Sequence, residues 1–184
     1  MTKFGIVKRA SSVGPLSIAV PGELKCFEYV HKKYGKLEWA SLFKPTILLA
    51  QNGFEIDSAL YNDLKTETET LLSFPTFRET YFDSKGNPLP VGTIIKRPDF
   101  AATLQTLSDE GVQSFYNGSL REKIFNDFRN SNFTFIINEQ DFENYSIETF
   151  DQPLSSFYQG YQLLFPPPPF STVVNAMALN ILER

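Results

Sequence analysis

The stretch that decides the fold is residues 163–184, LLFPPPPFSTVVNAMALNILER. Four consecutive prolines, residues 166–169, lead into a segment that is apolar on nearly every face of a helix. Ser171 is a suitable N-cap, so we expect a helix over residues 171–184. A helix that is apolar all round has to be buried by other elements on several sides. We therefore expect the polypeptide to be a piece of a longer one, whose other parts cover this helix.

The composition is that of a globular chain. Hydrophobic residues make up 42% of the 184 residues and charged residues 21%, which fits a single folded domain. The net charge of -4 is small and the two signs are interspersed, so the sequence offers no basic stripe and we expect no nucleic-acid partner. Because no run approaches about 20 apolar residues, we expect no membrane contact by this segment and no signal peptide in MTKFGIVKRA, residues 1–10.

The single cysteine and the single histidine restrict the chemistry. Cys26 cannot form an internal disulfide, and we expect it to be a small buried apolar side chain. His31, near a helix end, is expected to be a partly exposed ring. One Cys and one His cannot assemble a zinc site or a Cys-His dyad, so we predict no metal site and no cofactor.

Residues 22–130 are predicted to be mostly helical. A helix is expected over 23–34 with Gly35 as its C-terminal cap. A second helical stretch, 37–54, is bent or restarted at Pro45 and is ended by Asn52-Gly53. Asp57 or Ser58 then opens a more polar helix through Thr70.

Turn signals interrupt the middle of the chain. Lys85-Gly86-Asn87-Pro88 and Val91-Gly92 precede Pro98, which suits the first position of a helix running towards Glu110. Ser119 begins the next helix in our prediction, with Glu122 in capping-box spacing. Three apolar residues of that helix share a face: Leu120, Ile124 and Phe128.

The C-terminal part changes character. Residues 138–145 are predicted to form a short helix or turn, and a hairpin is predicted over 145–165, with strands 145–152 and 155–165 joined around Pro153. The proline tract is either a stiff spacer or a ligand for a proline-recognising module, and its flanking phenylalanines favour the spacer. The fold class is therefore α+β, mainly helical with a C-terminal β-hairpin.

Several long motifs resemble the large-subunit region of the gamma-glutamyltransferases, also called gamma-glutamyl transpeptidases or glutathione hydrolases. They are GPLSIAVPGEL at 14–24, the stretches 28–54 and 77–120, DFENYSIE at 141–148, YQGYQLLFPPPP at 158–169 and ALNILE at 178–183. The resemblance implies that the chain is a fragment of an αββα fold of the N-terminal-nucleophile hydrolases. It implies a precursor that cuts itself, after which the N-terminal threonine of the small subunit attacks the gamma-glutamyl bond of glutathione. The glutamyl group then passes to water, amino acids or peptides.

The resemblance assigns no catalytic residue to this chain. The nucleophile, the oxyanion-hole glycines and the residues that hold the glutamyl group belong to the small subunit, beyond residue 184. The arginine that pairs with the substrate carboxylate is expected upstream of SIAVPGE, before or around Met1, and neither Lys8 nor Arg9 is its match. Thr172 is assigned to helix capping. We expect a scaffold, inactive alone, whose partners are the small catalytic subunit of the same precursor and, through the complete enzyme, glutathione and gamma-glutamyl compounds.

Three glycosylation sequons begin at Asn117, Asn132 and Asn144. They agree with the surface location that the family resemblance implies, either the extracellular face of the plasma membrane or the secreted state. Two carboxylate pairs, Glu67 with Glu69 and Glu139 with Asp141, are assigned to solvated faces. Compared with the pattern of the family, bulky residues replace permissive ones at Cys26, in SNFTFII at 131–137 and in PPPPFSTVV at 166–174. The alternative function is therefore a non-catalytic glycosylated binding or structural module, or an inactive paralogue.

Overall fold

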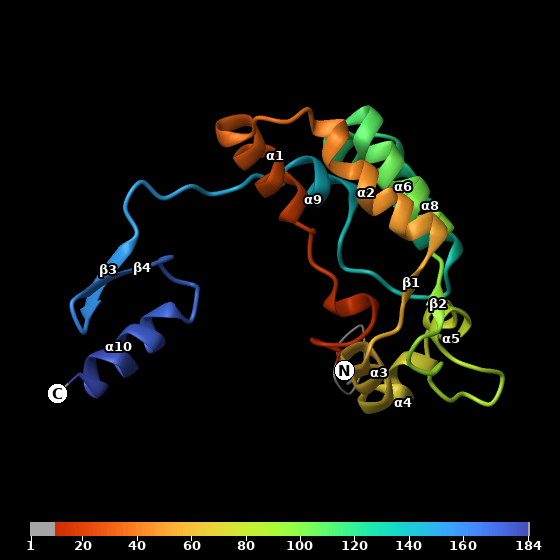
Figure 1. Ribbon diagram of the computed structural model, residues 1–184. Helices are drawn as coiled ribbons and strands as arrows, with labels where there is room; N and C mark the ends of the chain where they lie inside the picture. Colours follow the sequence, from red (N-terminus) through yellow and green to blue (C-terminus); the bar gives the residue numbers. More distant parts are fainter. Residues whose placement is uncertain (1–9, 184) are drawn as a thin grey trace, which may run out of the picture. The chain divides into compact units, whose positions relative to one another are not determined.

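The computed structural model describes residues 10–183 and divides the chain into two compact units (Figure 1). The first unit extends to Ser146 and the second begins at Ile147. Lys8, Arg9 and most of the stretch in which we expected no signal peptide lie outside the described residues, as does Arg184.

Unit 1 is mainly helical. Its elements in chain order are a 3-10 helix Pro15–Ser17, α1 Glu23–Tyr34, α2 Trp39–Asn52, β1 Phe54–Glu55, α3 Ser58–Thr66, α4 Thr68–Leu72, α5 Pro75–Tyr81, β2 Ile94–Ile95, α6 Pro98–Glu110, α7 Gln113–Asn117, α8 Ser119–Asn130 and α9 Glu139–Glu143.

The first two predicted helices are confirmed. The Gly35 backbone N–H donates to the His31 carbonyl at 2.7 Å and ends α1, while the Gly53 N–H donates to the Leu49 carbonyl at 2.9 Å and ends α2. Pro45 lies inside α2, which continues through it as one helix rather than restarting. The prediction of Pro98 as the first residue of α6 is also confirmed.

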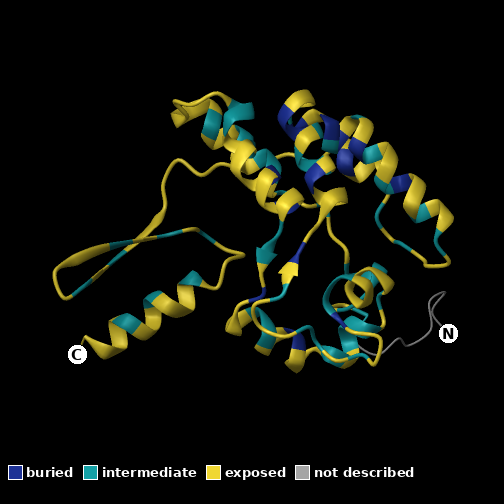
Figure 2. Cartoon of the chain, turned by 45° about the vertical axis from the view of Figure 1, so that its right-hand side comes forward, coloured by how far each residue is buried: buried dark blue, intermediate teal, exposed yellow. Residues whose placement is uncertain are grey.

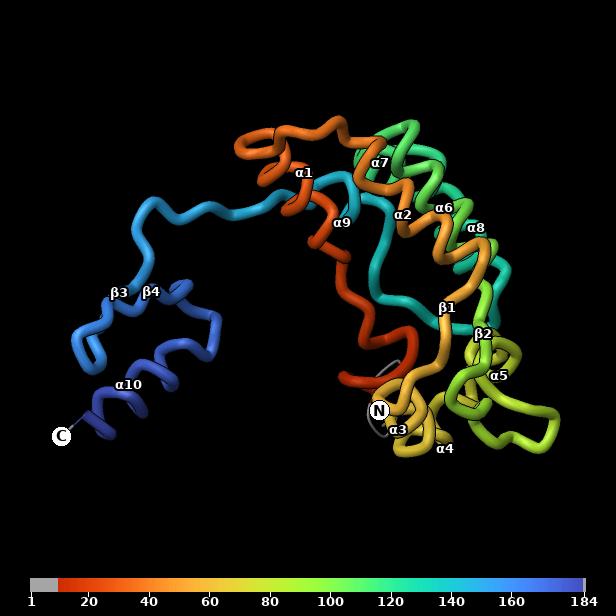
Figure 3. The backbone as a smooth tube through the Cα atoms, in the orientation of Figure 1, coloured from red at the N-terminus to blue at the C-terminus, as the bar shows by residue number. Residues whose placement is uncertain are grey.

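Helices α2 and α6 lie side by side (Figure 3). Small side chains allow this close approach, since Ala50 of α2 and Ala101 of α6 are buried together with Ile47. A second cluster joins α7, α8 and α9 around Val112, Tyr116, Phe125 and Phe142. Figure 2 shows that buried residues of unit 1 form small groups within a largely exposed surface.

The third cluster lies within residues 54–95. The two ends of this segment pair with each other as the strands β1 and β2. In that pair, β1 runs antiparallel to β2, with Phe54 opposite Ile95 and Glu55 opposite Ile94. The cluster consists of Ile56, Leu64, Phe82 and Ile95. The β1 to β2 pairing was not predicted.

The predicted helix through Thr70 is wrong in extent, because α3 ends at Thr66 and α4 begins at Thr68. Its start is confirmed, since the Asp57 carboxylate accepts the Leu60 N–H at 2.8 Å. Near the break, the Thr68 hydroxyl donates to the Leu64 carbonyl at 2.8 Å. Hydroxyls that bond to the preceding turn in this way compete with the regular helix.

The predicted capping box at Ser119 is also wrong. Ser119 is the first residue of α8 and its hydroxyl donates to the Glu110 carboxylate at 2.6 Å, so it does not cap the helix. A capping box is present at α9 instead. There the Asn138 side chain accepts the Asp141 N–H, and the Asp141 carboxylate accepts the Asn138 N–H at 2.8 Å.

Unit 2 contains β3 Leu154–Tyr158, β4 Tyr161–Phe165 and α10 Thr172–Leu182. The hairpin exists, but its predicted bounds are wrong: both strands lie after Pro153, and 145–152 forms no strand. The turn is Gln159-Gly160, with φ of 46° and 80°, the positive values that a two-residue type I′ turn requires. The predicted terminal helix is present, although the Ser171 side chain makes no capping hydrogen bond.

Candidate functional site

The surface of unit 2 is the first candidate site. The hairpin meets α10 through one face, because the Ser156 hydroxyl donates to the Asn180 side-chain oxygen at 2.8 Å. The Gln159 N–H also donates to the Glu183 carboxylate at 2.7 Å. These two hydrogen bonds align the helix along the hairpin, and Ala176 and Leu179 are half-buried.

The other faces of unit 2 are apolar and exposed. Phe157 and Leu164, which alternate with the residues facing α10, are 62% and 61% exposed. On α10, Val174, Met177 and Ile181 are 65%, 59% and 68% exposed. No residue between 147 and 183 is buried, so this unit has no core of its own among the residues that the structure describes.

A tyrosine pair anchors the SIAVPGE stretch of unit 1. The buried Tyr116 hydroxyl donates to the Pro21 carbonyl at 2.5 Å. The Lys25 ammonium donates to the Tyr145 carbonyl and lies 4.7 Å from the centre of the Tyr116 ring. Burial raises the pKa of Tyr116 above its ordinary value, because the charged phenolate loses hydration there. Sequence reasoning missed this site, since contacts between distant residues leave no local periodicity.

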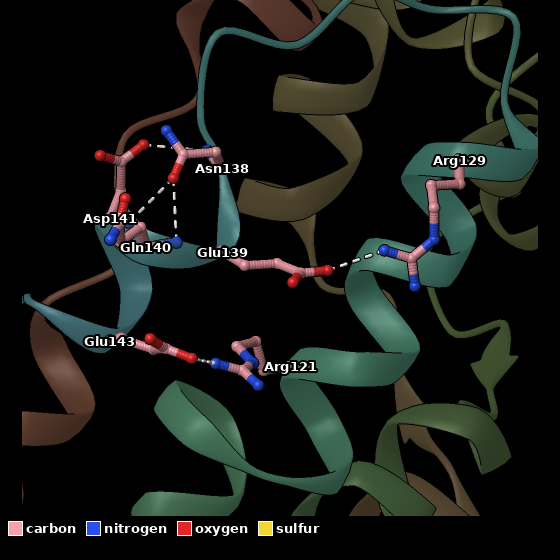
Figure 4. A network of polar contacts seen from close by, with 7 residues as sticks. All are labelled: Arg121, Arg129, Asn138, Glu139, Gln140, Asp141 and Glu143. Carbon is pink, nitrogen blue, oxygen red and sulfur yellow. Dashed lines mark hydrogen bonds and ion pairs between the residues drawn. The ribbon is translucent and has the colours of Figure 1, made fainter.

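Two ion pairs fasten α9 to α8 (Figure 4). Arg121 pairs with Glu143, and Arg129 pairs with Glu139 at 2.7 Å. The Arg121 side chain is only 13% exposed, whereas the Arg129 side chain is 59% exposed. Glu139 and Asp141, assigned from sequence to a solvated face, therefore hold α9 in place: Glu139 pairs with an arginine and Asp141 caps the helix.

An apolar hollow of about 490 Å³ lies between α1, α2 and α6. Phe27, Trp39 and Phe43 are among its lining residues. His31 also lines it, half-buried as expected, with its Nε2 atom 2.8 Å from the Leu37 carbonyl. Cys26 is exposed, which corrects the prediction of a buried side chain: it falls on the face of α1 that packs against none of the described clusters.

The three predicted sequon asparagines are exposed and all lie in unit 1. Asn117 is the last residue of α7, Asn132 lies between α8 and α9, and Asn144 follows α9. In unit 2, the assignment of Thr172 to helix capping is wrong: Thr172 is the first residue of α10, and its hydroxyl donates to the Pro166 carbonyl at 2.6 Å.

Among residues 10–183, no three His, Cys, Asp or Glu side chains come together in a way that could hold a metal ion. No helix described in that range combines the length and the apolarity that crossing a membrane requires.

Comparison with known proteins identifies the family. The gamma-glutamyltranspeptidase family model matches residues 3–184. This chain belongs to the gamma-glutamyltranspeptidase family. Among curated relatives, it is 35% identical to glutathione hydrolase 3 of Arabidopsis thaliana over 95% of its own length and 27% of the relative's. It is 33% identical to Scoloptoxin SSD14 of Scolopendra dehaani over 96% of its own length and 30% of the relative's.

The solved gamma-glutamyltranspeptidase of Helicobacter pylori has the same fold. The TM-score is 0.86 at 28% identity, covering 100% of this chain and 52% of that one. The expected fold class is confirmed: the chain is mainly helical with small strand pairs and matches N-terminal-nucleophile hydrolase structures. The chain spans less than a third of the length of the two curated relatives described above.

Proposed function

We propose that this chain is a large-subunit segment of a gamma-glutamyltransferase, and that the complete protein cleaves the gamma-glutamyl bond of glutathione. The glutamyl group is then transferred to amino acids, peptides or water. In this proposal the segment is scaffold, and the nucleophilic threonine belongs to a small subunit produced from the same precursor. Family membership and the length of the relatives support this division of roles.

The observation that carries the proposal is the lack of a core in unit 2. Chains below about 40 residues rarely fold without a metal, a disulfide or a partner. Residues 147–183 nevertheless form a hairpin and a helix whose outward side chains are apolar. Further elements must therefore cover Phe157 and Leu164 on one side and the α10 residues on the other. We assign at least one of these covers to the small subunit.

We also infer that the complete protein lies outside the cell, either secreted or on the extracellular face of the plasma membrane. The family resemblance and the three exposed sequons support this location.

The test is a charge placed on the outer face of the hairpin in the complete precursor. Leu164→Asp puts a carboxylate into the proposed interface, where desolvation without a partner is unfavourable. We expect loss of self-cleavage into two subunits and loss of gamma-glutamyl anilide hydrolysis. Val91→Asp is the matched control, since Val91 lies in an exposed turn of unit 1 and is 55% exposed.

Wild-type processing and hydrolysis by the Leu164→Asp precursor would contradict the proposed interface. A wild-type precursor that is cleaved into stable subunits but hydrolyses no gamma-glutamyl substrate would instead support an inactive paralogue or a binding module. Expressed alone, residues 1–184 are expected to bind a hydrophobic dye and to show no turnover.

A further inference from the structure

The dipeptide Asn-Gly occurs twice in the sequence, at Asn52-Gly53 and at Asn117-Gly118. In this dipeptide an asparagine side chain reacts most readily with the backbone, because glycine places no side chain beside the next nitrogen. Each asparagine is the last residue of a helix, Asn52 of α2 and Asn117 of α7. Both asparagines are exposed, and neither side chain hydrogen-bonds to another of the described residues. The two sites are therefore alike in sequence and in exposure.

The nitrogen of Gly53 is held on both sides. Its N–H donates to the Leu49 carbonyl at 2.9 Å, which is the hydrogen bond that ends α2. The next residue, Phe54, belongs to β1 and lies opposite Ile95 of β2. The peptide group between Asn52 and Gly53 is thus fixed between a helix end and a strand pair.

The nitrogen of Gly118 has no such partner. Within residues 10–183, the Gly118 N–H donates no hydrogen bond, although Gly118 directly follows α7. Its backbone is extended, with φ of -146° and ψ of -151°, and its carbonyl accepts the Glu122 N–H at 3.1 Å as α8 begins. The N–H group therefore stays unpaired between two helices.

This difference bears on deamidation, the loss of the asparagine amide. The reaction requires the next backbone nitrogen to lose its proton and to approach the side-chain carbonyl carbon. A hydrogen bond donated by that N–H opposes both changes, since it holds the proton and fixes the peptide plane. Ring closure at Asn52 has to break the last hydrogen bond of α2, whereas ring closure at Asn117 breaks no hydrogen bond of Gly118.

We propose that the folded protein deamidates spontaneously at Asn117, and that Asn52 is protected from the same reaction. The Gly118 nitrogen loses its proton and forms a bond to Cγ of Asn117, the bond between Cγ and Nδ2 breaks, and Nδ2 leaves as ammonia. Water then opens the resulting succinimide ring at one of its two carbonyls. One opening gives an aspartate at this position, and the other gives an isoaspartate, in which the main chain runs through Cγ.

The products change the junction of α7 and α8. The isoaspartate adds one carbon to the main chain between the buried residues Tyr116 and Leu120. The junction has little room for it, because a Cβ on Gly118 would lie only 2.9 Å from the Cα of Ser114. Since the Tyr116 hydroxyl donates to the Pro21 carbonyl, a shift of α7 also disturbs that contact. We therefore expect the deamidated protein to be less stable than the intact protein.

The experiment uses the complete protein from a host that attaches no N-glycans, because Asn117 also begins a sequon and a sugar on Nδ2 would obstruct ring closure. The folded protein is incubated at mildly alkaline pH in heavy-oxygen water, which labels each new carboxylate. Peptide mass spectrometry then measures the rate at both sites. We expect Asn117 to react at least about tenfold faster than Asn52, the factor for about 1.4 kcal/mol of local opening at Gly53.

The protein unfolded in urea is the matched control. Both sites carry the same dipeptide, so their rates should become similar once the hydrogen bond at Gly53 is lost. Asn117→Gln should remove the fast reaction, because glutamine has to close a larger ring, and should keep its unfolding temperature during an incubation that lowers that of the wild type.

Equal rates at the two sites in the folded protein, or a faster reaction at Asn52, would overturn the proposal. A ratio that is the same in urea as in the folded protein would also overturn it, because the flanking sequence and not the fold would then set the rates. Gamma-glutamyl hydrolysis is measured separately, so the proposed enzymatic role stands or fails on its own.

Discussion

The Tyr116 and Tyr145 rings stack with their planes 9° apart, and the Tyr145 hydroxyl occupies the space beside Gly22. A Cβ atom on Gly22 would lie 1.8 Å from that hydroxyl oxygen. The turn after Pro21, the end of α7 and the residue after α9 therefore meet here, and the position of the Tyr145 ring depends on the small size of Gly22.

Gly22→Ala is expected to destabilise the complete protein by about 1 to 3 kcal/mol, since an overpacked methyl group forces neighbouring atoms to move. Thermal unfolding followed by circular dichroism measures the effect. Gly92→Ala is the comparison, because Gly92 has φ of 86° and no atom within 4 Å of the added Cβ. Gly92→Ala therefore shows the cost of backbone strain without a clash, whereas Gly22, with φ of -91°, shows the cost of the clash without strain. A Gly22→Ala variant as stable as the wild type would contradict the packing argument.

Tyr116→Phe tests the buried hydroxyl. Removing it leaves the Pro21 carbonyl without its donor, which should lower stability at pH 7 by about 1 kcal/mol. Burial raises the pKa of Tyr116 above 10.0 in the folded protein. The stabilising contribution of the neutral phenol is therefore complete below pH 10 and is lost as pH rises through the folded pKa.

Urea unfolding at a series of alkaline pH values checks this pH dependence. The difference between wild type and Tyr116→Phe should shrink above pH 10. A difference that stays constant to the highest pH at which the protein folds would show that the hydroxyl does not titrate in this way.

The Asp83 carboxylate holds a turn within residues 54–95. Its carboxylate accepts the Asn87 backbone N–H at 2.8 Å, the Asn87 amide at 3.1 Å and the Lys85 N–H at 2.8 Å. These hydrogen bonds, those from Asn87 first, lower the pKa of Asp83 below 3.8. The ionised Asp83 carboxylate therefore stabilises the folded protein above pH 3.8, and this stabilisation is lost as the pH falls through the lower pKa of the folded protein.

Asn87→Ala removes the side-chain donor but keeps the backbone N–H. The Asp83 pKa, measured by carboxyl carbon NMR, should rise part of the way towards its ordinary value. Lys85→Ala is the comparison: its backbone N–H remains and only the Lys85 charge is lost, which lowers the Asp83 pKa less than the Asn87 hydrogen bonds do, so the rise should be smaller. A full return to the ordinary value in Asn87→Ala would mean that the backbone hydrogen bond contributes nothing.

The two ion pairs of α9 should differ in strength. Arg129→Ala removes an exposed pair and should change stability by at most about 1 kcal/mol. Arg121→Ala removes a largely buried side chain together with its pair and should lower stability by about 2 kcal/mol. Double-mutant cycles with Glu139→Ala and Glu143→Ala isolate the pair energies. A larger loss for Arg129→Ala would reverse the order that burial predicts.

Capping glycines and N-terminal prolines correctly predicted the ends of the helices that carry them. Gly35 and Pro98 mark real ends because the signal acts within one turn of the chain. The hairpin bounds were wrong because Gln159, which is not a usual residue for positive φ, shares the turn with Gly160. The two-residue strands β1 and β2 carry no detectable alternation.

The candidate site was predictable only in part. The exposure of the three sequon asparagines agrees with the motif. The role of Ser119 was wrong because the Glu110 carboxylate, contributed by the preceding helix α6, takes its hydroxyl. The stacking of Tyr116 on Tyr145 joins residues from α7 and from just after α9, and only the folded chain brings them together.

The antiparallel pairing of Phe54 with Ile95 has a consequence for how this fold can vary. Residues 56–93 begin and end at that one junction, and they supply Ile56, Leu64 and Phe82 to the cluster that Ile95 of β2 completes. The packing of α2 against α6 depends on where the segment returns and not on its length. We therefore expect changes of length within residues 56–93 to leave the rest of unit 1 on its course wherever they keep β1 paired with β2 and Ile95 buried.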